Sequence, residues 1–348
     1  MQEQSAGSFF FQGAVEAAIA AGYRHIDTAY SYNNEVDIGK ALCSKTKQGI
    51  IRRQDMFIVS KLWCTHHAPE DIPVCLNKSL KDLQLDYLDL YLKMGDELFP
   101  KKDGKMLTCD IDYVDVWRGM EALQASGKVK SIGVSNFSIL QLKRLLALCR
   151  VPPAVNQIEL HPYLVQTDMI EFCKSKNIAL TAYSPFGSPA RPPELFRGDT
   201  DPHKLLEDPV VADIAKKHRH SPAQVLLRYH VQQGIAVIPK SDKPHHILEN
   251  TKMFDFSLTE EDMRALRGLD RGWRACIADC CSVSQNQVSS ILPLCLRLPG
   301  EWREQTAHWI DEYHKHQQAS DQLHTVCCTC SITHCNSSVP CLHNNNRI

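Results

Sequence analysis

Charged and hydrogen-bonding side chains recur at one kind of position in this sequence, directly after short apolar runs. Asp27, Lys61 and the pair Ser135-Asn136 each follow such a run. A further set lies on the ends of other runs or just after them: Gln157, Glu159, His161, Tyr183, Ser184, Lys240 and Ser241. Side chains of these types can carry charge, bind polar groups and move protons, so together they would suit an enzyme site.

Each of these residues has a simpler interpretation when taken alone. Asp27 could cap a helix, and Lys61 could be a surface lysine. Ser135-Asn136 could serve a turn, and His25 could be a core histidine. The repeated placement at the ends of apolar runs favours a shared functional role over these separate ones.

The elements that must position these residues alternate between strand-like and helix-like patterns. Seven apolar runs predict strands: Tyr23–Thr28, Met56–Trp63, Tyr87–Met94, Val129–Val134, Ala154–Leu160, Ala179–Tyr183 and Ile235–Pro239. Amphipathic stretches between them predict helices: Glu35–Cys43, Glu70–Leu83, Asp115–Ala125, Leu140–Leu148, Asp168–Lys174, Pro209–Lys217 and Pro222–Gln233.

This alternation predicts a parallel sheet, because each parallel return needs a crossover. Seven strands come close to the eight of a closed β/α barrel, whose sites lie at the carboxyl ends of the strands. The fold class is therefore α/β, a (β/α)8 TIM barrel whose first strand is missing. Ser8–Phe11 is the one short segment before residue 14 that is a candidate to fill part of the gap.

Composition separates a central domain from two atypical ends. We expect an atypical N-terminus over residues 1–13, a barrel over 14–275 and a disordered tail over 276–348. Of the 15 cysteines, nine fall in the tail. One cluster in the tail could be interpreted as a zinc site, and it contains Cys327, Cys328, Cys330, His334, Cys335, Cys341 and His343. Its spacing lacks the paired geometry of structural zinc, so we predict no metal.

Bulk properties exclude several classes of protein. The 348 residues have 43% hydrophobic content and a net charge of -1, which gives no reason to expect nucleic acid as a partner. The apolar runs are too short for a membrane span, and the start lacks the features of a signal peptide. We therefore expect a cytoplasmic, monomeric enzyme that acts on a small molecule.

Several long motifs resemble the aldo-keto reductase superfamily, in its animal aldehyde and aldose reductase branch. The matching segments are Gly22–Glu35, Ile58–Trp63, Leu85–Leu92, Ile132–Phe137, Asn156–Tyr163, Ser221–Gln224 and Ile238–Ser241. The resemblance implies reduction of aldehydes or ketones to alcohols by hydride transfer from NADP(H). A Gly-x-Gly-x-x-Gly fingerprint is absent from the sequence, so a Rossmann site is not supported.

The resemblance also implies three catalytic roles. Tyr32 matches the tyrosine that gives a proton to the carbonyl oxygen. A free tyrosine has a pKa of about 10, and a nearby ammonium favours its phenolate form. Lys61 matches the lysine that supplies this ammonium, and Asp27 matches the carboxylate that orients the lysine.

The cofactor residues carry over in the same way. Ser135, Asn136 and Gln157 match the groups that bind the nicotinamide carboxamide. Tyr183, followed by Ser184, matches the aromatic ring that stacks on the nicotinamide. The remaining cofactor residues follow the last strand: Lys240 and Ser241 match the 2′-phosphate site, and Glu249 and Asn250 match the adenine contacts.

Three departures from the family pattern indicate a truncated or variant form. Met94 stands where the family has a catalytic histidine, and loss of such a polarising group commonly costs about a hundredfold in rate. Neither His66 nor His67 is an obvious substitute. The N-terminal hairpin and first strand are missing. His246 replaces an arginine, which weakens the preference for NADP over NAD, although Lys240 still favours phosphate.

Two other classes of function compete with an active reductase. The chain could be a binding module that keeps the cofactor without turnover, which the missing histidine favours. It could also be a misfolded product without function, which the missing strand suggests. The presence of Tyr32, Lys61 and Asp27 favours the enzyme.

Overall fold

The structure is a computed structural model that describes residues 3–94, 101–102, 105–106, 111–189, 201–202, 204–276 and 295–297. Its strands are β1 (His25–Asp27), β2 (Phe57–Leu62), β3 (Leu88–Met94), β4 (Lys101–Lys102), β5 (Lys105–Met106), β6 (Val129–Ser135), β7 (Val155–Glu159), β8 (Ala179–Tyr183), β9 (Ala236–Val237) and β10 (Cys295–Arg297). Its α-helices are α1 (Glu3–Ala20), α2 (Glu35–Lys47), α3 (Asp71–Leu83), α4 (Tyr113–Ala125), α5 (Ile139–Leu148), α6 (Thr167–Ser175), α7 (Pro209–His218), α8 (Pro222–Val231), α9 (Pro244–Thr251) and α10 (Glu260–Arg267).

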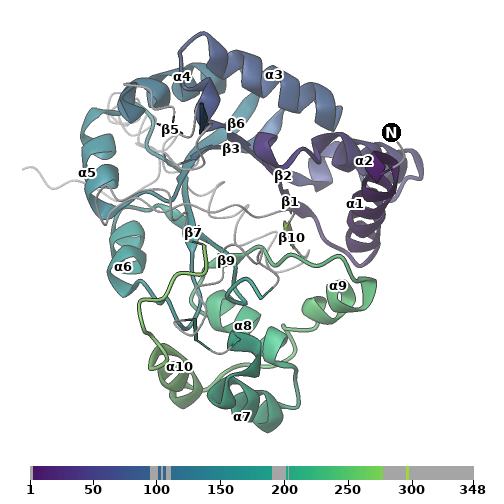
Figure 1. The fold of residues 1–348 in the computed structure, drawn as a ribbon, viewed down its shortest axis with the longest axis vertical. Helices are drawn as coiled ribbons and strands as arrows, with labels where there is room; N and C mark the ends of the chain where they lie inside the picture. Colours follow the sequence, from purple (N-terminus) through teal and green to yellow (C-terminus); the bar gives the residue numbers. More distant parts are fainter. Residues whose placement is uncertain are drawn as a thin grey trace, which may run out of the picture.

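Seven parallel strands form the centre of the molecule. They pair in the order β1-β2-β3-β6-β7-β8-β9 and curl into a half-barrel, with the helices in an outer ring (Figure 1). The prediction of a parallel β/α sheet with seven strands is confirmed. Carboxyl ends of parallel strands open at the same side, so the polar residues that follow them share one mouth.

The two faces of the sheet bury different clusters of side chains. Ile58 and Leu62 of β2 belong to the large core cluster that also contains helix residues such as Leu76. Val59, the residue directly after Ile58, points to the opposite face and belongs to a smaller cluster with Leu90, Leu92, Ala154 and Val155. This alternation follows from the two-residue period of a strand and gives the barrel an apolar inner layer beneath its mouth.

One glycine is required by the inner packing. A Cβ at Gly133 of β6 would stand 2.7 Å from Leu92 Cδ2 and 2.8 Å from the Val155 carbonyl oxygen. The carbonyl of Val155 is backbone and cannot move without disturbing β7, so only glycine fits at this position.

Local sequence signals fix the starts of several helices. Ser221 caps α8 and exchanges hydrogen bonds with Gln224, with Pro222 at the first helical position. Thr259 caps α10 in the same reciprocal manner with Asp262. These capping boxes satisfy backbone donors that a helix leaves free.

The N-terminal segment differs from its prediction. Ser8–Phe11 lies within α1 and not in a strand, so the suggestion that it fills the place of the first strand is wrong. The helical pattern continues through Ala14, Val15, Ala18 and Ile19, which are all buried on one side, and the chain before them extends the same helix. The expected boundary between residues 13 and 14 therefore falls inside a helix.

Helix α1 closes the outer ring. It packs between α2 and α9, which belong to opposite ends of the sheet (Figure 1). Beside it, the buried Tyr23 hydroxyl donates a 3.1 Å hydrogen bond to the Ile247 carbonyl of α9, across 224 residues of sequence. In the helical layer, the first and last units of the barrel thus meet directly.

At the edge of β1 lies a strand that the sequence did not predict. Cys295–Arg297 pairs antiparallel with β1, with Ile26 opposite Leu296. The free edge of β1 presents unpaired backbone groups, and a strand from elsewhere in the chain satisfies them. The remainder of the tail expected to be disordered, including the cysteines and histidines considered for zinc, lies outside the described residues.

Within the described part of the chain, no helix combines the length and the apolar character that a bilayer crossing requires.

Candidate active site

A lysine on one strand and a carboxylate on its neighbour form the centre of the site. Lys61 Nζ binds Asp27 Oδ1 and donates a 2.9 Å hydrogen bond to the Thr28 carbonyl. Both side chains are almost fully buried, at 1% and 2% exposure. Burying two charges is costly unless they pair and fill their hydrogen-bonding capacity, and this arrangement meets that condition.

Tyr32 lies beside this ion pair. It ends the short 3₁₀ helix Tyr30–Tyr32 that follows β1, and Lys61 Nζ stands 5.0 Å from the centre of its ring. The structure therefore brings together the three residues predicted to be catalytic. Asp27 caps no helix, and Lys61 is not a surface lysine, so the simpler interpretations of both residues are excluded.

Gln157 joins the group from the other side of the sheet. Its Nε2 donates a 2.7 Å hydrogen bond to Asp27 Oδ2, from β7 to β1. Both oxygens of Asp27 are thus occupied, one by Lys61 and one by Gln157. Ser135 Oγ in turn donates to the Gln157 carbonyl at 2.9 Å. The sequence placed these two residues at the mouth but did not predict the link to Asp27.

The ends of β6 and β8 bring Asn136 and Tyr183 together. The Tyr183 hydroxyl donates a 2.9 Å hydrogen bond to Asn136 Oδ1. Asn136 Nδ2 is buried and has no hydrogen-bond partner within the part of the chain that is described. Asn136 and Ser184 both have left-handed backbones, with φ of 60° and 50°. Such backbones at non-glycine residues commonly mark functional sites.

The residues predicted for the cofactor phosphate and adenine form a second group at α9 and the loop before it. Lys240 Nζ lies 3.6 Å from Asp242 Oδ2, and Ser241 Oγ accepts from the Lys243 amide at 3.2 Å. Asn250 is buried in α9. The Glu249 carbonyl accepts a 3.0 Å hydrogen bond from Gln224 Nε2, which ties α9 to α8.

Met94, which stands in place of the family's histidine, and His66, a possible substitute, lie on different elements. Met94 is the last residue of β3 and pairs in register with Ser135 of β6. His66 lies in the 3₁₀ helix Cys64–His66, where its Nδ1 is 2.8 Å from Thr65 Oγ1 and its ring lies 5.0 Å from that of Tyr30. His66 thus already has partners outside the Lys61–Asp27 pair.

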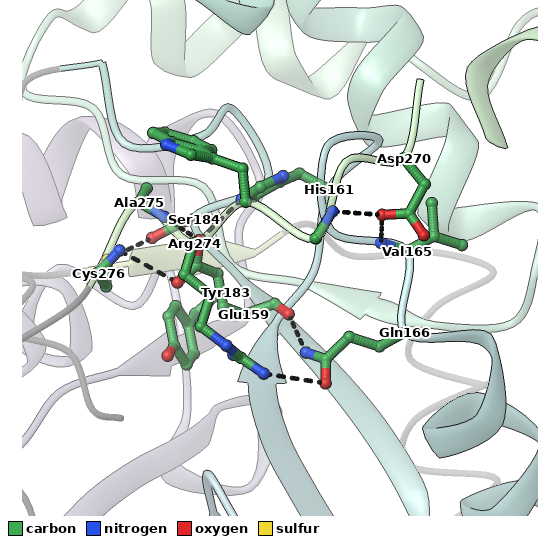
Figure 2. Close-up of polar contacts among 12 residues, drawn as sticks. Glu159, His161, Val165, Gln166, Tyr183, Ser184, Asp270, Arg274, Ala275 and Cys276 are labelled. Carbon is green, nitrogen blue, oxygen red and sulfur yellow. Dashed lines mark hydrogen bonds and ion pairs between the residues drawn. The ribbon is translucent and has the colours of Figure 1, made fainter. Parts of the chain in front are cut away.

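A further buried network lies at the end of β7, and sequence reasoning gave it no role (Figure 2). Glu159 Oε1 accepts hydrogen bonds from His161 Nε2 at 2.8 Å and from the Ala275 amide at 2.6 Å. Its Oε2 accepts from the Cys276 amide at 3.2 Å. Glu159 and His161 were noted as strand-end residues. Their partners 116 and 117 residues away in the chain could not be found from spacing.

The curled parallel sheet and its strand-end site are typical of a β/α-barrel enzyme, and sequence comparison identifies the family. The profile of the Aldo/keto reductase family matches residues 10–271, and the chain belongs to that family.

Individual relatives place it more closely. It is 47% identical to aldo-keto reductase family 1 member C1 of Macaca fuscata fuscata over 271 residues, which cover 75% of this chain and 83% of the relative. It is 46% identical to aldo-keto reductase family 1 member A1 of Gallus gallus, with 75% and 81% covered. The solved aldose reductase of Schistosoma japonicum is similar in structure, with a TM-score of 0.68, 39% identity and 75% and 85% covered. These relatives confirm the resemblance to the aldehyde and aldose reductase branch.

Proposed function

We propose that the chain reduces aldehydes or ketones to alcohols with NADPH, and that Tyr32 donates the proton. The buried Lys61–Asp27 pair beside the Tyr32 ring is the observation that carries this proposal. An ammonium next to a phenol favours the phenolate, so it lowers the cost of giving the proton to a carbonyl oxygen.

Asp27 holds the Lys61 ammonium in place. Its two oxygens bind Lys61 and Gln157, so neither the carboxylate nor the ammonium can turn away from the mouth. Because both charges are buried, water screens the field of Lys61 only weakly, and its effect on Tyr32 is stronger than at a surface.

The residues at the ends of β6 and β8 fit the nicotinamide end of the cofactor. Asn136 Nδ2 is a buried donor without a described partner, and a carboxamide oxygen would satisfy it. Tyr183 would offer its ring to the nicotinamide while its hydroxyl stays on Asn136. When bound, NADPH supplies the hydride.

The second group would hold the adenosine end, with Lys240 and Ser241 at the 2′-phosphate and Glu249 and Asn250 at the adenine. Asp242 lies close to Lys240 and offsets part of its charge. With His246 in place of an arginine, we expect a weaker preference for NADPH over NADH than a fully cationic site would give.

We expect the barrel, with helix α1 included, to work as a cytoplasmic monomer on small carbonyl compounds. Met94 at the position of the family's histidine favours slow turnover, since a thioether cannot donate a hydrogen bond to the carbonyl. The same observation supports a second candidate, a module that binds the cofactor without turnover.

The deciding experiment is NADPH oxidation by the purified protein with a reactive aldehyde, measured beside Tyr32→Phe and Tyr30→Phe. Tyr30 lies in the same 3₁₀ helix, so its variant controls for the loss of a hydroxyl. Turnover that falls about a hundredfold or more only in Tyr32→Phe supports the reductase. Folded protein that binds NADPH without turnover supports the module, and protein that does not bind NADPH contradicts both.

A further inference from the structure

Glu159 is a buried carboxylate without a part in the proton chemistry proposed above. It stands on β7 two positions beyond Gln157, and its side chain is completely shielded from solvent. A buried carboxylate is retained only where several donors compensate for its lost hydration. The identity of those donors therefore indicates what the residue does.

Two of the donors come from the segment that follows α10. The amides of Ala275 and Cys276 both point at the carboxylate, one at each oxygen, and His161 Nε2 provides the third contact. Burial favours the neutral acid, but the hydrogen bonds from His161 and Ala275 outweigh it and lower the pKa of Glu159. Glu159 is thus ionised at neutral pH.

Further contacts hold the same segment along its length. Gln166 Nε2 donates to the Glu159 carbonyl at 2.7 Å, and Arg274 Nη2 donates to Gln166 Oε1 at 3.4 Å (Figure 2). The ring of Trp273 lies 5.7 Å from the ring of His161, and its amide donates to the Tyr163 carbonyl at 3.0 Å. His161, Tyr163 and Gln166 thus help Glu159 to fix residues 273–276.

The fixed segment packs directly on the residue predicted to stack on the cofactor. Ala275 and Cys276 share one buried cluster with Tyr183 and Ile238. Cys276 Sγ also lies 3.6 Å from Ser184 Oγ. Tyr183 is therefore held by Asn136 at its hydroxyl and by the 275–276 segment along its side.

We propose that Glu159 is a positioning residue for cofactor binding, which clamps residues 273–276 against Tyr183 through two backbone amides. This inference rests on the proposed function for the role of Tyr183. The clamp itself is a property of the protein without cofactor.

A carboxylate suits this role better than an amide. Three N–H donors converge on Glu159, and a carboxylate can accept all of them on its two oxygens. In Glu159→Gln one oxygen becomes an NH₂ group, which faces a donor and leaves at least one backbone amide unsatisfied. The variant keeps the size of the side chain, so packing is little changed.

The first test is hydrogen–deuterium exchange of the Ala275 and Cys276 amides in the protein without cofactor. We expect Glu159→Gln to speed exchange there by about tenfold or more, with little change in β2. The matched control is Glu171→Gln, which removes the same charge from an exposed position on α6. Equal exchange in the two variants would overturn the clamp. If Glu159→Gln fails to fold, Ala275→Pro removes one donor from the other side, and faster exchange at Cys276 is then expected.

The second test is the dissociation constant for NADPH. With Tyr183 less well held, we expect Glu159→Gln to weaken NADPH binding by about tenfold, and kcat at saturating NADPH to change less than twofold. Faster exchange with unaltered NADPH affinity would overturn the positioning role. Failure of the wild-type protein to bind NADPH would contradict the proposed function instead, while the exchange result would still decide the clamp.

Discussion

Lys61 and Asp27 form an ion pair that is closed off from solvent on neighbouring strands, and Asp27 is also bound by Gln157 from across the sheet. Removing one member of such a pair leaves the other charge buried and unpaired. Stability and activity should therefore respond differently to changes at these two positions.

We predict that Lys61→Met lowers the free energy of unfolding by about 3–5 kcal/mol, because Asp27 loses its cation. Adding Asp27→Asn to it should recover most of that loss, since both charges are then gone. Carbonyl reduction should stay abolished in the double variant. Urea unfolding and NADPH oxidation measure the two effects. Recovery of activity together with stability would contradict the role of Lys61 beside Tyr32.

The position of Met94 gives a gain-of-function prediction. The residue ends β3 and pairs in register with Ser135, one of the strand-end residues of the candidate site. We expect Met94→His to raise kcat for an aldehyde by about ten- to a hundredfold, because an imidazole can donate a hydrogen bond to the carbonyl. Met94→Leu serves as the control and should not raise kcat. Equal kcat values in the two variants would mean that the absence of a histidine at position 94 does not limit turnover.

Cofactor preference should respond to charge near Lys240. His246→Arg adds a permanent cation that can bind phosphate through two hydrogen bonds. We expect the ratio of the NADH to the NADPH dissociation constant to rise by about tenfold. His245→Arg adds the same charge one residue earlier in α9 and should change the ratio less. Calorimetric titration of both nucleotides provides the measurement, and it does not depend on turnover.

Asp242→Asn tests the same site from the opposite direction. Asp242 lies 3.6 Å from Lys240 and repels an incoming phosphate. Its neutralisation should strengthen NADPH binding and leave NADH binding nearly unchanged. A parallel gain for both nucleotides would place the phosphate elsewhere.

Burial of His230 leads to a prediction of how the stability of the protein depends on pH. Burial, with a smaller contribution from His161, lowers the pKa of His230 from 6.5 to about 3. The unfolded chain therefore binds this proton at a higher pH than the folded chain does. The contribution of neutral His230 to the free energy of unfolding is complete above about pH 6.5. It is lost as the pH falls toward 3, by at most about 1.4 kcal/mol per pH unit.

The comparison that checks this uses His230→Gln and the exposed His245→Gln. Between pH 6.5 and 4 we expect the unfolding free energy of His230→Gln to fall less steeply than that of the wild-type protein. His245→Gln should follow the wild-type slope. Identical slopes for all three proteins would contradict a buried, neutral His230.

Most of the fold was predictable because the sequence repeats one local pattern. All seven predicted strands occur within a few residues of their expected limits, since each is an apolar run that a helix must follow. Ser8–Phe11 was misjudged because a short aromatic run carries little periodic information, and its helical context only becomes clear over the longer span to Ala20. The pairing of β10 with β1 depends on an open edge, which no local pattern indicates.

The site was predictable to the level of individual strand ends and not to the level of contacts. Asp27, Lys61 and Tyr32 meet because parallel strands place their ends together. The hydrogen bond from Gln157 to Asp27 crosses the barrel and depends on side-chain reach. Glu159 carried a signal, its position two residues beyond Gln157, but its amide partners lie far along the chain.

The hydrogen bond between Tyr23 and Ile247 also bears on the order in which the protein folds. Because the ring of helices closes between α1 and α9, contacts of α1 on one side must wait until most of the chain has been synthesised. Contacts this distant in sequence slow folding, since the loop between them must be ordered first. Until then, the side of α1 that later contacts α9 stays exposed. On the ribosome-bound chain, this side is where a chaperone that binds apolar helices would bind.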